Sequence, residues 1–173
     1  CTFMLNKQQL REKIQSQGLI KNFVDLETQL TPQGFDLTVQ EIHSYEGKGR
    51  LDFSNSEREI SGSEKLRPEK GDESDEYGWW HLEKGVYKVK MNEKVDIPED
   101  LTGLAFPRSS LLRMGCTIDN AVWDSGYTGT GSFMLHVENP DGVSIKENAR
   151  LNQIVFLEIE QTEEGYSGKY HEA

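Results

Sequence analysis

The sequence of 173 residues has little positive charge. It holds 30 Asp and Glu against 19 Lys and Arg, a formal net charge of −11. A general nucleic-acid binder, or a protein that binds an anionic membrane, needs a basic surface, so neither partner is expected. A small anionic ligand remains compatible with this charge, because a local cluster of cations with a bound metal ion outweighs the global field.

Long apolar runs, paired cysteines and zinc motifs are also missing. No run approaches the ~20 apolar residues of a membrane span, and no basic segment precedes an apolar one as in a signal peptide. Cys1 and Cys116 allow at most one bridge, and we expect two reduced thiols in a cytoplasmic protein. The histidines lack zinc spacing and no Cys-x-x-Cys pair occurs, which disfavours a zinc-dependent nucleoside deaminase. A P-loop and a dinucleotide fingerprint are absent as well.

What the sequence does contain is a short helix followed by many short strands. Asn6 as N-cap, Gln9 at the capping-box position and Gly18 as C-cap predict the helix. Apolar and polar residues then alternate with period two in four segments: 35–39, 87–91, 133–137 and 155–159. Turn residues separate these segments, so we expect one all-β domain over residues 1–173, a barrel or jelly-roll with a short N-terminal helix.

The stretch 57–76 differs from the rest of the chain. It is charged, contains Pro68 and Gly71, and has almost no aromatic residue. We interpret it as a mobile or surface excursion between strands, and a rim over a binding site is the alternative.

Residues 107–113 (PRSSLLR) put a cation and two hydroxyls at an expected strand-to-helix turn. The planar guanidinium of Arg108 matches phosphate oxygens. The hydroxyls of Ser109 and Ser110, with adjacent backbone N–H groups, complete a candidate phosphate cradle. The alternative is an N-capping serine beside a surface arginine.

Residues 122–129 (VWDSGYTG) carry a carboxylate followed by an aromatic residue. Asp124 can accept a proton from an attacking water, and Tyr127 can stack on a sugar or a base. The flanking glycines let the backbone approach a ligand closely. A hairpin with an Asp turn and a core Tyr is the alternative. Asp119 is a rival for the carboxylate role, although it lacks the following Gly-Tyr-x-Gly.

Two segments near the end of the sequence complete the candidates. Gln153 precedes an apolar strand and is a candidate phosphate or water ligand, or else an edge-strand polar residue. Residues 165–170 (GYSGKY) combine glycines, aromatics and a cation. This composition suits a flap over residues 163–173 that closes on a stacked base and a phosphate, with a frayed terminus as the alternative.

In their order along the chain, these segments resemble the dUTPase and dCTP deaminase superfamily, most closely the archaeal-type dUTP diphosphatases. The segments similar to the first four dUTPase motifs are 33–37, 107–111, 122–129 and 149–156. The resemblance implies a distorted jelly-roll of the dUTPase type, assembled as a homotrimer with active sites between subunits. It also implies hydrolysis of dUTP to dUMP and pyrophosphate with Mg²⁺. The metal is implied to be held mainly by the substrate triphosphate, so no protein ligand set for it is expected.

The resemblance also implies roles for single residues. Asp124 orients and deprotonates the attacking water, and Tyr127 lies against the deoxyribose. The backbone from Asn120 to Asp124, which includes Trp123, reads the uracil edge. The other substrate-binding residues that the resemblance implies are Arg108, Ser109, Ser110, Arg113, Gln153, Tyr166 and Lys169.

Some positions depart from the dUTPase pattern or from the deaminase pattern. The Gly-rich fifth dUTPase motif is absent, and residues 165–170 resemble the deaminase tail instead. A deaminase needs a catalytic Glu three residues before an Asn, where this chain has His136, and an Arg two residues before the carboxylate, where it has Val122. A two-residue slip in the preceding loop would bring Glu138 into register. We therefore expect a dUTP diphosphatase. A dCTP deaminase, alone or bifunctional, and a non-catalytic nucleotide-binding regulator are the alternatives.

Overall fold

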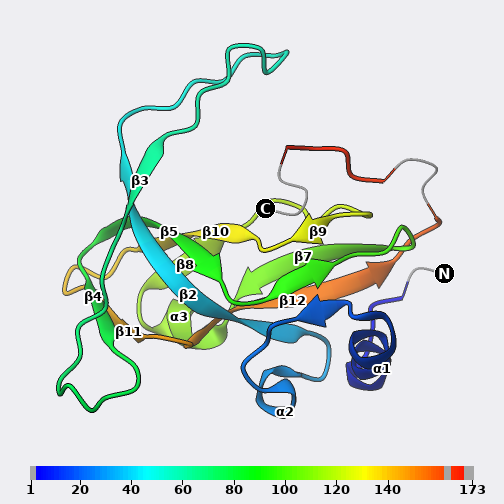
Figure 1. Ribbon diagram of the computed structural model, residues 1–173, viewed down its shortest axis with the longest axis horizontal. Coiled ribbons are helices and arrows are strands. Elements are labelled where there is room, and N and C mark those ends of the chain that lie inside the picture. Colours follow the sequence, from blue (N-terminus) through cyan, green and yellow to red (C-terminus); the bar gives the residue numbers. More distant parts are fainter. Residues whose placement is uncertain (1–2, 162–164, 170–173) are drawn as a thin grey trace.

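The computed structural model describes residues 3–161 and 165–169, which form a barrel of short strands flanked by small helices (Figure 1). The helices are α1 (Lys7–Gln17), α2 (Leu26–Gln29) and α3 (Ser109–Arg113). The strands of the first half are β1 (Ile20–Lys21), β2 (Phe35–Glu46), β3 (Gly62–Lys65), β4 (Trp79–Leu82), β5 (Gly85–Met91) and β6 (Lys94–Asp96). Those of the second half are β7 (Leu101–Pro107), β8 (Cys116–Asp119), β9 (Thr128–Gly129), β10 (Ser132–Val137), β11 (Val143–Lys146) and β12 (Arg150–Glu158).

Helix α1 confirms the predicted N-terminal helix. The Asn6 side chain accepts a hydrogen bond from the Gln9 N–H, and the Gln9 side chain accepts one from the Asn6 N–H. Gly18 ends the helix in the left-handed conformation, with φ of 70°. Leu10 and Ile14 are buried and attach the helix to the barrel. No helix in the described part of the chain is long and apolar enough to cross a membrane.

The main sheet has the strand order β7-β12-β2-β5-β10-β8, and every neighbouring pair is antiparallel. β3 adds to the end of β2. The sheet curls into a nearly closed barrel, and alternate side chains fill one interior, among them Phe35, Val89, Leu135, Ile154 and Phe156, which are all fully buried. The predicted all-β barrel is therefore confirmed.

The barrel closes between β7 and β8 without a backbone ladder in the described residues. Asn120, just after β8, instead donates a side-chain hydrogen bond to the carbonyl of Ala105 in β7, at 3.1 Å. Trp123 then exchanges two backbone hydrogen bonds with Gly103, of 2.9 and 3.0 Å. The segment after β8 is consequently tied to β7 at two points.

A hairpin arm of residues 47–61 projects from the barrel beyond the end of β2 (Figure 1). Arg50 and Glu59 pair across it, and Phe53 near its tip is fully exposed. The charged stretch 57–76 spans more than one element of the structure. Its first residues return along the arm, its middle forms β3, and Glu69 pairs with Trp79 at the start of β4.

Cys116 is a free, buried thiol at the start of β8. Burial raises the pKa of this thiol. The group is therefore protonated and unreactive at neutral pH. Cys1 lies outside the described residues.

Candidate active site

A cavity of about 780 Å³ opens on the outer face of the barrel, beside the segment that follows β8. Five residues of the predicted site line it: Asn120, Trp123, Asp124, Tyr127 and Tyr166. Asp119, the rival carboxylate, borders the same cavity, as do Ile60 and Ser61 at the base of the arm. The structure thus brings together the residues predicted for water activation and for the nucleoside.

Asp124 sits at the start of a tight turn whose backbone is fixed. The Tyr127 N–H donates to the Asp124 carbonyl at 3.2 Å, and the buried Ser125 hydroxyl donates to the Leu101 carbonyl at 2.7 Å. Gly126 has a φ of 76°, a conformation that favours glycine. The Asp124 side chain is exposed, and no hydrogen bond to its carboxylate is found within the described residues. This carboxylate is therefore available to accept a proton from a bound water.

Three aromatic rings form one wall of the cavity. Trp123 and Tyr127 meet edge to face at 5.6 Å between ring centroids, and Tyr127 and Tyr166 do the same at 5.4 Å. The Trp123 ring packs directly on Gly131, since a Cβ there would lie 2.1 Å from the ring. Burial, and secondarily the Tyr166 hydroxyl, raises the pKa of Tyr127. Tyr127 is thus buried in the core and also lines the cavity. A core position and a role in ligand binding are therefore compatible for this residue.

The described part of the tail, residues 165–169, lies against the turn that carries Asp124. The Tyr166 N–H donates to the Ser125 carbonyl at 2.7 Å. Lys169 is exposed and does not line the cavity. Other residues of the predicted 163–173 flap lie outside the described ranges, so the flap stays a prediction.

The predicted phosphate cradle is built around a buried carboxylate, Asp36, which is 1% exposed. Arg108 Nε lies 2.8 Å from Asp36 Oδ2, and Arg150 Nη1 lies 3.3 Å from the same oxygen. The Gln153 amide donates to the other oxygen at 3.3 Å. Burial raises the pKa of Asp36, and the two arginines oppose that shift. Sequence reasoning did not single out Asp36, although the 33–37 match contained it.

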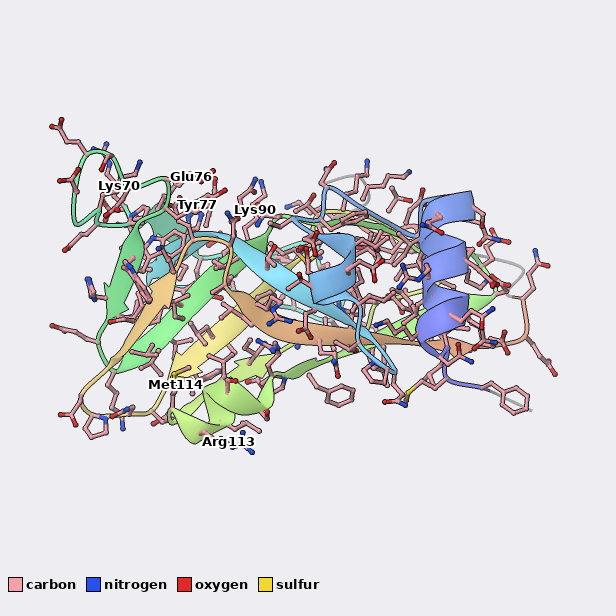
Figure 2. The ribbon with its side chains drawn as sticks, turned by 90° about the horizontal axis from the view of Figure 1, so that it is seen from below. Lys70, Glu76, Tyr77, Lys90, Arg113 and Met114 are labelled. Atoms are coloured by element: carbon pink, nitrogen blue, oxygen red, sulfur yellow. The ribbon has the colours of Figure 1, made fainter. Side chains whose placement is uncertain are left out.

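The hydroxyl pair of the cradle begins helix α3. Arg108 occupies the N-cap, so neither serine is the N-cap, and Ser109 and Ser110 are exposed. Arg113 ends the helix on its outer side, and in Figure 2 it lies across the molecule from Lys90, which lines the cavity. None of the residues predicted for phosphate binding on β7, α3 and β12 lines the cavity: Arg108, Ser109, Ser110, Arg113 and Gln153. One chain therefore holds two separate halves of the predicted site.

Two cations in the cavity were not predicted. Lys88 and Lys90 of β5 line it, and neither forms an ion pair with a described residue. They alternate with the buried Val89 and Met91. The period-two pattern that predicted the strand thus contained the signal, since it directs the lysines to the outer face.

The residues that would indicate a deaminase do not reach the cavity. His136 Nε2 lies 3.0 Å from Asp119 Oδ2, and Glu138 forms an ion pair with Lys84 at 3.1 Å. Neither lines the cavity, where β10 contributes Ser132, Phe133 and Met134 instead. β10 pairs with β5 in unbroken register from Ser132 to Val137, and Glu138 follows directly after this ladder.

Comparisons with known proteins give consistent results. The family model described as dCTP deaminase-like matches residues 4–159. A protein of Methanococcoides burtonii named probable deoxyuridine 5'-triphosphate nucleotidohydrolase is 43% identical over 169 residues, covering 96% of each chain. A Methanocaldococcus jannaschii protein named deoxyuridine 5'-triphosphate nucleotidohydrolase is 41% identical over 152 residues, covering 87% of this chain and 93% of its own.

A solved structure shares the fold. The 2'-deoxycytidine 5'-triphosphate deaminase of Agrobacterium tumefaciens superposes with a TM-score of 0.64 at 21% identity, over 91% of this chain and 49% of the deaminase chain. The chain therefore spans about half the length of that protein. At this identity the likeness bears on the architecture of the barrel alone.

Proposed function

The chain belongs to the dCTP deaminase-like family, and within that family we propose that it hydrolyses dUTP to dUMP and pyrophosphate. Relatives of nearly the same length carry the name of that activity. The observation that carries the proposal is the exposed carboxylate of Asp124, which borders a cavity walled by Tyr127 and Trp123. The position where a deaminase needs a glutamate holds His136.

In the proposed reaction Asp124 acts as the general base. Its carboxylate takes a proton from a water molecule, whose oxygen attacks the α-phosphorus. The bond from this phosphorus to the bridging oxygen of the β-phosphate breaks, and pyrophosphate leaves with the electron pair. Tyr127 lies against the deoxyribose and excludes a 2'-hydroxyl. The backbone of residues 120–124 reads the uracil edge, and Tyr166 adds a ring next to it.

The phosphates are held by the cradle of another copy. Arg108, Ser109, Ser110 and Gln153 do not border the cavity that Asp124 borders, so one chain does not present a complete site. We propose a homotrimer in which the cradle of one subunit meets the cavity of the next, with Arg113 and Lys169 adding charge to the phosphates. The free thiol of Cys116 suits a cytoplasmic enzyme.

In the proposed reaction Mg²⁺ binds together with the nucleotide. Within the described residues no group of three or more His, Cys, Asp or Glu side chains could hold a metal ion, and Asp36 is occupied by two arginines. Mg²⁺ in phosphoryl-transfer enzymes binds substrate phosphates and keeps several waters. The donor set thus fits an ion held mainly by the triphosphate. When bound, the ion neutralises charge on the phosphates.

Product analysis tests this function. The protein is incubated with Mg²⁺ and either dUTP or dCTP, and dUMP, pyrophosphate and ammonia are measured. We expect dUMP and pyrophosphate from dUTP, and no ammonia from dCTP. Ammonia from dCTP would show a deaminase and direct attention to Glu138. Nucleotide binding without any product would show a regulator.

A further inference from the structure

Asn152 is a polar residue in the interior of the barrel. It belongs to the central strand β12 and is 0% exposed. Its Nδ2 donates to Asn120 Oδ1 at 2.7 Å, and its Oδ1 faces Asn120 Nδ2 at 3.4 Å. A buried amide is tolerated where it is hydrogen-bonded, and an apolar side chain would fill the same space without that requirement. The pair therefore calls for a reason beyond packing.

The pair fixes which way the Asn120 amide points. Because Asn152 donates to Asn120 Oδ1, the Asn120 Nδ2 is turned toward the Ala105 carbonyl, to which it donates at 3.1 Å. This hydrogen bond lies where β7 and β8 have no ladder between them in the part of the chain that the structure describes. Asn152 thus sets the connection that holds the end of β8 on β7.

Residues 120–123 are attached to β7 at both ends of the segment. At its far end Trp123 is paired with Gly103, and the Thr102 hydroxyl donates to the Trp123 carbonyl at 3.1 Å. Between them, Ala121 and Val122 are exposed and line the cavity. Without the first attachment, residues 120–122 would be held only by the pairing of Asp119 with Met134 at one end and of Trp123 with Gly103 at the other, and the backbone that faces a base would shift.

We propose that Asn152 is a positioning residue that acts through Asn120 to hold residues 120–124 in the conformation that reads the base and presents Asp124. Asn152 does not line the cavity, so it touches no ligand there. The inference rests on the proposed dUTP hydrolysis for the identity of the base. It adds a residue, and a means of action, that the proposed reaction does not contain.

Asn152→Ala removes the side-chain hydrogen bonds to Asn120, and Asn152→Leu removes them while keeping about the size of the side chain. A displacement of about 1 Å in a reacting group lowers rates by up to about 100-fold. We expect both variants to lower kcat for dUTP by roughly 10- to 100-fold. We also expect the preference for a non-hydrolysable dUTP analogue over the dCTP analogue to fall, because the reading backbone is displaced.

Asn92→Ala is the matched control. Asn92 Nδ2 donates to Thr38 Oγ1 and Asn148 Oδ1, both at 2.9 Å, in a similar part-buried amide network that does not border the cavity. Its loss should lower the thermal midpoint about as much as the loss of Asn152. It should leave kcat and the uracil preference unchanged when all proteins are assayed well below their midpoints.

Hydrogen exchange of the amides in 121–124 gives a readout that is independent of turnover. Faster exchange there in both Asn152 variants, and not in Asn92→Ala, is the expected result. Unchanged exchange, or unchanged kcat and base preference in a folded Asn152→Leu protein, overturns the inference. So does an equal loss of preference in Asn92→Ala. If the wild-type protein does not hydrolyse dUTP, the proposed function is overturned. If the wild-type protein hydrolyses dUTP and the Asn152 variants do so equally well, only this inference is overturned.

Discussion

The guanidinium of Arg108 is held by Asp36, with Arg108 Nε 2.8 Å from Asp36 Oδ2 and the carboxylate 1% exposed. The same oxygen faces Arg150, so the pair is braced from a second side. Moving Arg108 to the cavity beside Asp124 would leave the buried Asp36 carboxylate with one cation fewer, which is costly. Each half of the predicted site is therefore fixed where it lies.

Mixing two inactive variants should restore activity if the halves come from different subunits. Asp124→Asn and Arg108→Ala should each be inactive alone. When they are unfolded together and reassembled, a mixed trimer contains sites with an intact Asp124 and an intact cradle. About a quarter of wild-type activity is expected for random 1:1 assembly in a cyclic trimer. Light scattering should show a trimer, and no recovery in a verified mixed trimer would mean that both residues of a site belong to one chain.

Asp124→Asn alone should separate chemistry from folding. The Asp124 side chain is exposed and has no hydrogen bond within the described residues, so stability should change by no more than about 0.5 kcal/mol. Turnover of dUTP should fall by roughly 10²–10⁴-fold, the usual contribution of a general base. Asp119→Asn is the control, because Asp119 borders the same cavity. If Asp119→Asn lost as much activity and Asp124→Asn kept it, the roles would be exchanged.

Removing the residues after Gly165 should affect turnover far more than stability. Tyr166 packs its ring against Tyr127 and donates a backbone hydrogen bond to the Ser125 carbonyl. Closing a tail over a site excludes water and strengthens the charge interactions around the phosphates, so we expect a loss of about tenfold or more in kcat. The thermal midpoint should move by only a few degrees, roughly the effect of 1 kcal/mol. Tyr166→Phe keeps the ring and should stay active, and a fully active truncated chain would show that the tail is not a flap.

Glu93 gives the fold a buried carboxyl group that titrates. It is 0% exposed and accepts hydrogen bonds from the Thr38 hydroxyl, the Gln29 amide and the Thr38 N–H at 2.6, 2.7 and 3.0 Å. Burial raises the pKa of Glu93 above its ordinary value of 4.5, and these hydrogen bonds only partly oppose the shift. Because the folded state binds the proton more tightly, the stability from this group is present below pH 4.5 and is lost as the pH rises through the raised pKa.

Comparing Glu93→Gln with the wild type isolates this titration. Glutamine does not ionise, while carboxylates with lowered pKa values, such as Glu41 and Asp96, contribute equally to both proteins. The advantage of the wild type in unfolding free energy should therefore be larger near about pH 4 than near about pH 7. Urea unfolding at several pH values measures it. A difference that is constant with pH, or one that grows with pH, would contradict the assigned direction of the pKa shift.

The parts of the fold with local signals were predictable. Helix α1 was predicted from its cap residues, Asn6 and Gly18, and is confirmed. The strands predicted at 35–39, 87–91 and 133–137 are confirmed as parts of β2, β5 and β10. Their alternation was visible because each strand has one face in the same interior. β12 was predicted only at 155–159, yet it begins at Arg150. A bulge between Arg150 and Asn152 breaks the alternation there.

The sequence signals of strands β3, β4 and β11 were too weak to predict them. They are four residues each, and β3 is largely exposed, so no apolar alternation marks it. Their pairing depends on neighbours far along the chain, which propensity does not reveal.

The candidate site shows the same difference between residues close together in the sequence and residues far apart in it. Asn120, Asp124 and Tyr127 could be grouped into one candidate site from the sequence because they are nearly contiguous, and they line one cavity. Asn152 was not singled out because its partner Asn120 is 32 residues away in the sequence. Its proposed role also depends on the absence of a ladder between β7 and β8 in the described residues. A polar residue in an apolar strand, as Asn152 is in β12, is a signal of a buried hydrogen bond. The sequence does not reveal which residue accepts that hydrogen bond.

The position of β12 has a consequence for the order in which this protein is made. β12 follows all the other strands in the sequence, yet it lies between β2 and β7 in the sheet. Its Gln153 reaches Asp36 across 117 residues. Chain entropy makes such distant pairings slow to form. During synthesis the predicted phosphate cradle therefore forms only after residue 153 has left the ribosome, and until then β2 and β7 each present an unpaired edge that other chains can join.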